Sequence, residues 1–345
     1  MKIVVLAGGL SPERDVSINS GLKVRDALRR KGHSAVMVDV YLGIEREIAD
    51  FEQVFDEEID YGLTGYIGCD APDLAEVKAM RQDKSAALIG PNVLPLCLRA
   101  DIVFMALHGE IGENGKLQAL FDIYGIKYTG SGSLGSAIAM DKEVSKELFA
   151  NRSLLSARHI PLKKGEAVPP QIPYPCIVKP CTSGSSIGVS KVNEPAALEA
   201  ALKEAFIYDN RLLIEEFIPG REFAVAVMDG LALPVIEIQP KGEFFDYNHK
   251  YQAAASLEIC PAELPEEMSR HIQSMAEQAF SCLSLNVYAR MDFILHPDGR
   301  VFILEANTLP GMTPTSLVPQ EAAAVGIDYD SLCELIIEVS LRRFE

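Results

Sequence analysis

The chain opens with a pattern that restricts its fold strongly. Residues 3–7 form a continuous apolar run, which is typical of a strand buried on both faces. A loop over 8–14 follows, and a helical pattern over 16–31 ends with basic residues in its last turn. A second apolar strand is expected at 35–40. This strand–helix–strand order predicts a parallel sheet and hence an α/β fold at the start of the chain.

After residue 40, expected strands and helices alternate less regularly along the chain. The stretch 41–100 is acidic and broken by Gly and Pro, and we expect an excursion with a hairpin and one helix near 73–82. The further expected strands are 102–107, 175–180, 186–192, 211–217, 222–229, 231–238 and a hairpin over 287–307. The further expected helices are 116–124, 134–150, 194–206, 265–283, 317–325 and 329–343. The pattern predicts an α/β part followed by an α+β part.

Composition narrows the choice of partners. The chain has 345 residues, enough for about two or three domains, and a formal net charge of −17 without any Lys/Arg-rich run. Such a chain repels nucleic-acid backbones and anionic membranes, so we expect small-molecule partners, no nucleic acid and no membrane. Seven cysteines form no CxxC pair, which argues against a disulfide framework or a zinc site and favours the reducing cytoplasm.

Three Gly-rich stretches need to be distinguished. The segment 109–116 differs from a P-loop in its spacing, and Leu117 stands where a magnesium-binding hydroxyl is required. The segment 130–135 matches G-x-G-x-x-G but has no acidic residue about 20 positions later, so a tight turn that opens a helix is the better interpretation. In the segment 179–188, Lys179 follows a strand and precedes a small-residue loop. That loop is either a phosphate cradle or a plain hairpin turn.

The hairpin over 288–307 carries the strongest signal. If Asp298-Gly299 forms a two-residue turn, Asp292 lies opposite Glu305 and Arg290 lies opposite Asn307. All four side chains then share one face, because side chains alternate along a strand. The residues expected on the other, core-facing side are Met291, Phe293, Leu295, Phe302, Leu304 and Ala306.

Two carboxylates opposite each other on a sheet repel unless another charge compensates. A hard cation with Asp292, Glu305 and Asn307 as oxygen ligands would do so, and few protein ligands favour Mg²⁺ over Ca²⁺. The alternatives are a raised carboxyl pKa and neutralisation by Arg290. The sequence favours the metal.

Other polar residues stand where ligands commonly bind. His108 ends the apolar strand 102–107, and Glu13 lies in the loop after the first strand; such positions face ligand crevices in parallel sheets. Structural roles are the alternatives for both. Lys250 and Tyr251 lie in a polar loop, which is either a lid or a solvated segment.

Taken together, these motifs resemble the D-alanine–D-alanine ligases of bacteria. The matching segments are Gly8–Ser17, Leu107–Gly109, Gly112–Gly115, Met140–Lys142, Val178–Pro180, Gly184–Ser190, Lys250–Tyr251 and Leu304–Thr313. Their order and spacing fit over nearly the whole chain except about 41–98. Cys181-Thr182-Ser183 is not the commonest version of the loop entry.

The resemblance implies an ATP-grasp fold. An N-terminal α/β substrate domain (1–130) is expected to precede a central ATP-grasp lobe (131–215) and a C-terminal lobe with the metal site (216–345). The implied reaction joins two D-alanines at the expense of ATP through an acyl phosphate, for peptidoglycan precursors. The implied cofactors are ATP as co-substrate and two Mg²⁺ or Mn²⁺. A cytoplasmic homodimer is expected.

Roles follow from the resemblance position by position. Glu13 should bind the ammonium of the first D-alanine, and Tyr251 should close the loop, coupled to Glu13 through Ser185. Arg290 and the Gly311 N–H should stabilise the oxyanion. Residues expected at the amino-acid substrates also include His108, Lys250, Ser316 and Leu317. Residues expected at ATP are Lys142, Lys179, Ser185, Glu215, Glu216, Phe217, Ile218 and Glu222. The implied metal ligands are Asp292, Glu305 and Asn307.

Three other functions compete with this one. The same fold serves ligases whose second substrate is D-lactate or D-serine, and Tyr251 after Lys250 favours D-alanine in the resemblance. A nucleotide-binding regulator without turnover is opposed by the joint presence of metal ligands, both lysines and Arg290. A dehydrogenase would rest on the weak 130–135 match alone.

Overall fold

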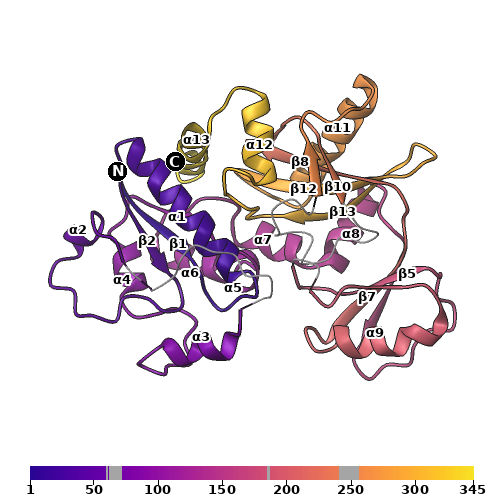
Figure 1. The fold of residues 1–345 in the computed structure, drawn as a ribbon, viewed down its shortest axis with the longest axis horizontal. Helices are drawn as coiled ribbons and strands as arrows, with labels where there is room; N and C mark the ends of the chain where they lie inside the picture. Colours follow the sequence, from indigo (N-terminus) through magenta and orange to yellow (C-terminus); the bar gives the residue numbers. More distant parts are fainter. Residues whose placement is uncertain (60, 62–71, 185–186, 241–255) are drawn as a thin grey trace.

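The structure is a computed structural model that describes residues 1–59, 61, 72–184, 187–240 and 256–345. These residues form three separate sheets, one parallel and two antiparallel. In Figure 1 the parallel sheet lies at the N-terminal end, the sheet with β5 and β7 lies at the opposite end, and the largest sheet lies between α12, α11 and α7. The predicted sequence of an α/β part and a mixed α+β part is confirmed.

The N-terminal sheet has the strand order β2-β1-β3, with β2 at Ser34–Asp39, β1 at Lys2–Ala7 and β3 at Ile102–Met105. Both pairings are parallel, as the strand–helix–strand pattern predicts. Helix α1 (Arg14–Arg30) packs against β1 and β2 and also against α13 (Tyr329–Arg342) from the far end of the chain. The loop before α1 therefore emerges at the carboxyl end of β1, where parallel sheets present their ligand sites.

The smallest antiparallel sheet has the order β4-β7-β5-β6. Its strands are β4 (His159–Lys163), β7 (Arg211–Glu216), β5 (Cys176–Pro180) and β6 (Ser190–Val192), and α9 (Leu198–Ala205) packs on β5 and β6. The sequence pattern does not reveal β4, because only Leu162 of its residues is buried. The pattern over 194–206 divides into a short 3-10 turn and α9.

The largest sheet has the order β11-β10-β8-β12-β13, and β9 pairs with β8. Its strands are β8 (Arg221–Met228), β9 (Leu231–Ala232), β10 (Ile236–Pro240), β11 (Ser256–Ile259), β12 (Tyr288–Leu295) and β13 (Val301–Asn307). The single strand expected at 231–238 is thus two strands. Helix α11 (Glu266–Cys282) packs on β8 and β12, and α12 (Leu317–Ala324) packs on β8.

The helix expected over 134–150 is interrupted. Helix α7 spans Ser133–Met140 and α8 spans Lys142–Asn151, with Asp141 in an extended conformation between them. The Asp141 carboxylate accepts the Val144 N–H at 3.3 Å and so caps α8. Lys142 is therefore the first residue of a helix rather than an interior one. Gly132 precedes α7, which confirms the interpretation of 130–135 as a turn that opens a helix.

The hairpin prediction is partly wrong. The pairs Arg290 with Asn307 and Asp292 with Glu305 form as expected, but the register shifts between Asp292 and Phe293. The turn is therefore a five-residue connection over 296–300 between β12 and β13, not a two-residue turn at 298–299. A β-bulge places one extra residue, Leu304, in β13.

The expected core residues Met291, Phe293, Leu295 and Ala306 are confirmed, but the bulge reverses the core face of β13 between Val301 and Leu304. Val301 and Ile303 join the apolar cluster under the sheet, whereas Phe302 and Leu304 do not. The pairs that carry the predicted polar face lie on the other side of the bulge, so that face is unaffected.

The segment 41–100 differs from the expected hairpin with one helix. The structure has three short helices there, α2 (Phe51–Val54), α3 (Leu74–Met80) and α4 (Val93–Cys97), and its described residues contain no strand. Helices α5 (Glu110–Glu113) and α6 (Lys116–Tyr124) follow β3. No helix in the described part of the chain is long and apolar enough to cross a membrane. Six cysteines within the described ranges are free thiols: Cys97, Cys176, Cys181, Cys260, Cys282 and Cys333.

Candidate active site

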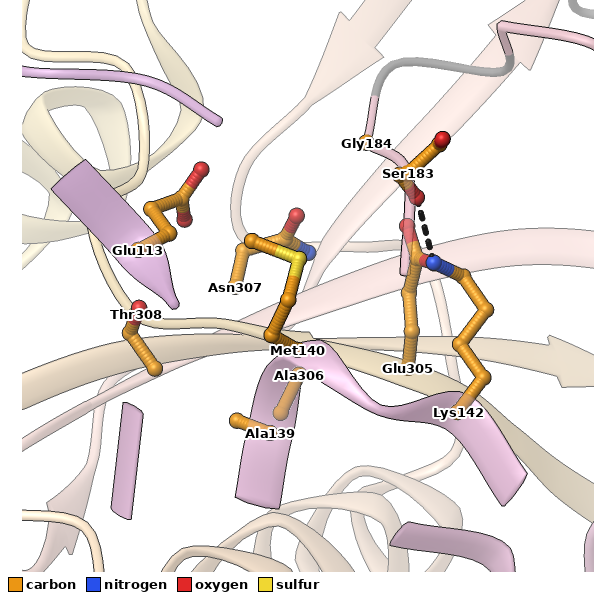
Figure 2. A pocket seen from close by; sticks show the side chains of 10 residues that line it. All are labelled: Glu113, Ala139, Met140, Lys142, Ser183, Gly184, Glu305, Ala306, Asn307 and Thr308. Carbon is orange, nitrogen blue, oxygen red and sulfur yellow. Dashed lines mark hydrogen bonds and ion pairs between the residues drawn. The ribbon is translucent and has the colours of Figure 1, made fainter. Parts of the chain in front are cut away.

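One pocket brings together segments that are far apart in the sequence. It is lined by Glu113, Ala139, Met140, Lys142, Ser183, Gly184, Glu305, Ala306, Asn307 and Thr308. These residues come from α5, the junction of α7 and α8, the loop after β5, and the end of β13 (Figure 2). The motif segments Gly112–Gly115, Met140–Lys142, Gly184–Ser190 and Leu304–Thr313 thus each contribute to this one pocket.

Lys142 points into this pocket from the start of α8. Its ammonium donates to the Ser183 carbonyl at 2.5 Å and lies 3.5 Å from the Glu305 carboxylate (Figure 2). Its backbone N–H donates to the Cys181 carbonyl at 3.0 Å. The side chain is only 8% exposed. The break at Asp141 is what directs this ammonium at the loop after β5.

Lys179 is the last residue but one of β5 and forms a second cationic position. Its ammonium lies 2.9 Å from the Glu215 carboxylate on the neighbouring strand β7. The other oxygen of Glu215 lies 3.1 Å from the ammonium of Lys146, a residue of α8 that the sequence analysis does not identify. Burial opposes ionisation of Glu215, but the two ammonium groups hold the pKa of this carboxyl below its ordinary range.

The polar face of the β12–β13 hairpin is assembled as predicted. The Arg290 guanidinium donates two hydrogen bonds to Asp292, at 2.7 and 2.8 Å. The Asn307 amide donates to the same carboxylate at 3.0 Å. Glu305 lies opposite Asp292 in the register. Arg290 therefore neutralises Asp292, one of the alternatives to a metal, while the oxygen-rich face remains.

This face has the chemistry of a magnesium site. Asp292, Glu305 and Asn307 offer carboxylate and amide oxygens, the donors that Mg²⁺ prefers. No group of three or more His, Cys, Asp or Glu side chains arranged for a metal occurs among the described residues. The three side chains fit an ion that takes its other ligands from water and phosphate oxygens.

Glu13 lies beside the loop after β5. A Cβ atom on Gly184 would stand 3.1 Å from the Glu13 carboxylate, and one on Gly109 would stand 3.3 Å from it. Gly109 also has a φ of +64°, which favours glycine. Glu13 is 7% exposed and precedes α1. Two loops with small residues thus converge on one carboxylate.

A buried ion pair orders the loop that carries Glu13. The guanidinium of Arg14, which follows Glu13, lies 2.5 Å from the Asp39 carboxylate and donates to the Gly9 carbonyl at 2.8 Å. Asp39 accepts the backbone N–H groups of Tyr41 and Leu42 at 2.8 and 2.9 Å. Sequence analysis misses this pair because the partners lie on different elements.

His108 and Glu113 lie next to the loop at Leu309. His108 has Nδ1 2.9 Å from the Leu309 carbonyl, and its Nε2 is buried with no hydrogen-bond partner in the described structure. Glu113 accepts from the Gly109 and Leu309 N–H groups at 2.6 and 3.2 Å. Burial and then the nearby charge of Glu13 raise the pKa of Glu113. Sequence analysis does not single out Glu113, although it lies within a quoted motif.

Gly311, expected at the oxyanion, lies close to Ser316, which is expected at the amino-acid substrates. The Ser316 hydroxyl accepts the Thr313 N–H at 3.0 Å, and a Cβ atom on Gly311 would stand 3.0 Å from this hydroxyl. Leu317 begins α12. Ser185, Lys250 and Tyr251 lie outside the described residues, so their expected positions stay predictions.

Of the residues expected at ATP, the resemblance assigns Glu215 to Ile218 to the adenine, and these four lie at and just after the end of β7. Glu216 is paired with Arg158 at 2.7 Å, and the Lys191 ammonium lies 3.7 Å from the Phe217 ring. Ile218 is half-buried. Glu222 stands on β8 opposite Ile238 and Ile294, so it belongs to the largest sheet. The residues expected at ATP thus span the passage from the β4-β7-β5-β6 sheet to the largest sheet.

Comparison with known families identifies the fold. A family model described as the D-ala D-ala ligase N-terminus matches residues 2–131, and one described as the D-ala D-ala ligase C-terminus matches residues 153–338. The chain belongs to the D-alanine–D-alanine ligase family. This confirms the resemblance drawn from the motifs and, with it, the ATP-grasp fold class.

Full-length relatives agree with this membership. The D-alanine–D-alanine ligase of Pediococcus pentosaceus is 44% identical over 98% of this chain and 97% of its own length. That of Lacticaseibacillus casei is 43% identical over 100% of this chain and 97% of its own length. A crystal structure of the Bacillus anthracis D-alanine–D-alanine ligase complexed with ATP matches with a TM-score of 0.76 and 29% identity, covering 99% and 98% of the two chains. The segment 41–98, which the motifs leave out, lies inside these alignments.

Proposed function

We propose that the protein joins two D-alanine molecules into D-alanyl-D-alanine, converting ATP to ADP and phosphate, for the synthesis of peptidoglycan precursors. One observation carries the proposal: Lys142 and the Asp292–Glu305 face approach each other across one pocket inside a chain of this ligase family. The pocket therefore presents cationic groups and oxygen ligands together, as phosphoryl transfer requires.

The chemistry begins at the first D-alanine. Glu13 holds the ammonium of this D-alanine. The carboxylate of the same D-alanine takes the terminal phosphoryl group of ATP, which forms an acyl phosphate and releases ADP. Lys142 and Lys179 bind the ATP phosphates as point charges. Glu215, Glu216, Phe217 and Ile218 line the adenine, and Glu222 accepts from the ribose. Mg²⁺ held by Asp292, Glu305 and Asn307 would neutralise charge on the phosphates when it is bound.

The second D-alanine then attacks the acyl phosphate. Lys250, Ser316 and Leu317 hold its carboxylate, while its amine forms the new C–N bond. Arg290 and the Gly311 N–H stabilise the oxyanion of the tetrahedral intermediate, which releases phosphate. Ser185 and Tyr251 keep the loop closed over the site, and His108 contacts the amino-acid substrate. The buried Nε2 of His108, which has no hydrogen-bond partner among the described residues, supports a polar ligand there.

Domain division and assembly are further parts of the proposal. We propose three units, residues 1–130, 131–215 and 216–345, which the three separate sheets support. Helices α7 and α8 contact β13 and α11, so they join the second unit to the third. We further propose a cytoplasmic homodimer, to be checked by light scattering of the purified protein and by cell fractionation.

The decisive experiment measures phosphate release from ATP and Mg²⁺ with single amino acids and with pairs. D-Alanine should support release and dipeptide formation, whereas D-lactate and D-serine as second substrates should support much less. Lys179→Met should raise the KM for ATP more than the KM for D-alanine. Phosphate release that does not depend on D-alanine would refute the assignment. A Lys179→Met variant in which only the KM for D-alanine changes would also refute it.

A further inference from the structure

The side chains of Lys146, Glu215 and Lys179 form a row of alternating charge next to the proposed phosphate site. The Lys146 ammonium lies 3.1 Å from one oxygen of Glu215, and the Lys179 ammonium lies 2.9 Å from the other. Lys146 also donates to the Ala157 carbonyl at 3.2 Å. The residue is 2% exposed, against 8% for Lys179, so Lys146 is the inner member of the row.

The net charge of these three side chains determines how strongly they attract the phosphates of ATP. Lys179 and Glu215 alone form a neutral pair, and a neutral pair gives little net attraction for a polyphosphate. Lys146 adds a second positive charge to the same carboxylate, so the cluster of three has a net charge of +1 when all are ionised. Lys146 thereby compensates the charge of Glu215. The positive charge of Lys179 can then attract the ligand.

We propose that Lys146 is a positioning residue for ATP: it neutralises Glu215 from behind, so that Lys179 presents an uncompensated ammonium to the phosphates. The inference rests on the proposed ATP site and adds a residue that touches neither ATP nor D-alanine. Burial lowers the pKa of Lys146, and the Glu215 charge opposes this effect. The two ammonium groups face different oxygens of Glu215, so each lysine compensates its own side of the carboxylate.

The size of the effect follows from Coulomb's law. A unit charge roughly 10 Å from a phosphate group, in a medium of effective dielectric constant about 20, changes affinity by roughly ten- to twenty-fold. Adenosine has no phosphate and should not sense this charge. The ratio of the inhibition constants of adenosine and ADP therefore isolates the electrostatic role, because any distortion of the adenine slot affects both ligands.

The test compares this ratio in five proteins. Lys146→Met should lower it about ten-fold, and Lys146→Arg, which keeps the charge, should leave it within about three-fold of wild type. Lys146→Met with Glu215→Gln returns the net charge to +1 and should recover most of the ratio. Lys203→Met removes an exposed lysine of α9 and serves as the matched control, with no change expected.

An unchanged ratio in Lys146→Met would overturn the inference, whether both ligands bind as in the wild type or both lose affinity equally. If Lys146→Met alone does not fold, the double variant and Lys146→Arg decide: a ratio in either that is about ten-fold below wild type would overturn the inference, because both keep the net charge of +1. Failure of the proposed function is distinguishable, since the wild type would then show no D-alanine-dependent release of phosphate from ATP for ADP to inhibit.

Discussion

Glu321 carries a carboxyl group that the fold encloses completely. It lies on α12 with no exposed surface, and one of its oxygens accepts the Ala226 N–H of β8 at 2.5 Å. The other oxygen has no hydrogen-bond partner in the described structure. Burial, opposed by the Ala226 N–H and the charge of Arg290, raises the pKa of Glu321 from 4.5 to about 8.

The raised pKa of Glu321 makes the stability of the fold depend on pH. Between pH 4.5 and 8 the folded chain keeps a proton on Glu321 that the unfolded chain has released, so stability falls as pH rises. The limiting cost above pH 8 is about 5 kcal/mol of the free energy of unfolding. At pH 5 the same carboxyl costs under about 1 kcal/mol.

Glu321→Gln should therefore stabilise the protein at alkaline pH. The amide oxygen still accepts the Ala226 N–H, and the side chain no longer ionises. Urea unfolding followed by circular dichroism should show a gain of about 2–5 kcal/mol at pH 8.5 and little change at pH 5. Glu338→Gln, at an exposed position of α13, is the control and should give the same difference from wild type at both pH values. A gain for Glu321→Gln that does not depend on pH would refute the reasoning.

Three further predictions concern the proposed machinery. Glu305→Gln should raise the Mg²⁺ concentration needed for half-maximal turnover and cut the rate strongly, because a ligand charge is lost; unchanged turnover at low Mg²⁺ would contradict the site. Arg14→Met should lower the free energy of unfolding by about 3–5 kcal/mol, because it leaves the buried Asp39 carboxylate without its cationic partner. Adding Asp39→Asn should restore part of this loss, so an equal loss in the double variant would argue against the ion pair. Tyr251→Phe should raise the ratio of phosphate to dipeptide and weaken the preference for D-alanine over D-lactate; if both stay at wild-type values, the lid argument fails.

Local patterns were sufficient for the elements that carry the site. The apolar run before Gly8 predicts β1, and the helical period that follows predicts α1, because a buried parallel strand and an amphipathic helix have different periods. The alternation of side chains places Asp292 and Glu305 on one face of a hairpin, and the structure has them opposite each other. The pairing near the site therefore follows from the sequence and a turn at roughly the correct place.

The bulge in β13 shows where such reasoning ends. Residues 301–304 are Val-Phe-Ile-Leu, so either face of this run is apolar and the alternation gives no preference. Packing against the cluster beneath the sheet selects Val301 and Ile303 for the core, and the extra residue is accommodated as a bulge. The interruption at Asp141 is similar, because its capping role depends on the chain leaving the helix there.

The charged interior is decided by tertiary structure alone. Lys146 meets Glu215 across 69 positions of chain, and Arg14 meets Asp39 from another element. Glu321 loses its solvent because α12 packs on β8. In the sequence Lys146, Arg14 and Glu321 look like ordinary surface charges, since hydrophobic periodicity reports which face is apolar and not which charges are enclosed. Burial raises the cost of an unpaired charge, so the partners supplied by distant segments determine what these residues do.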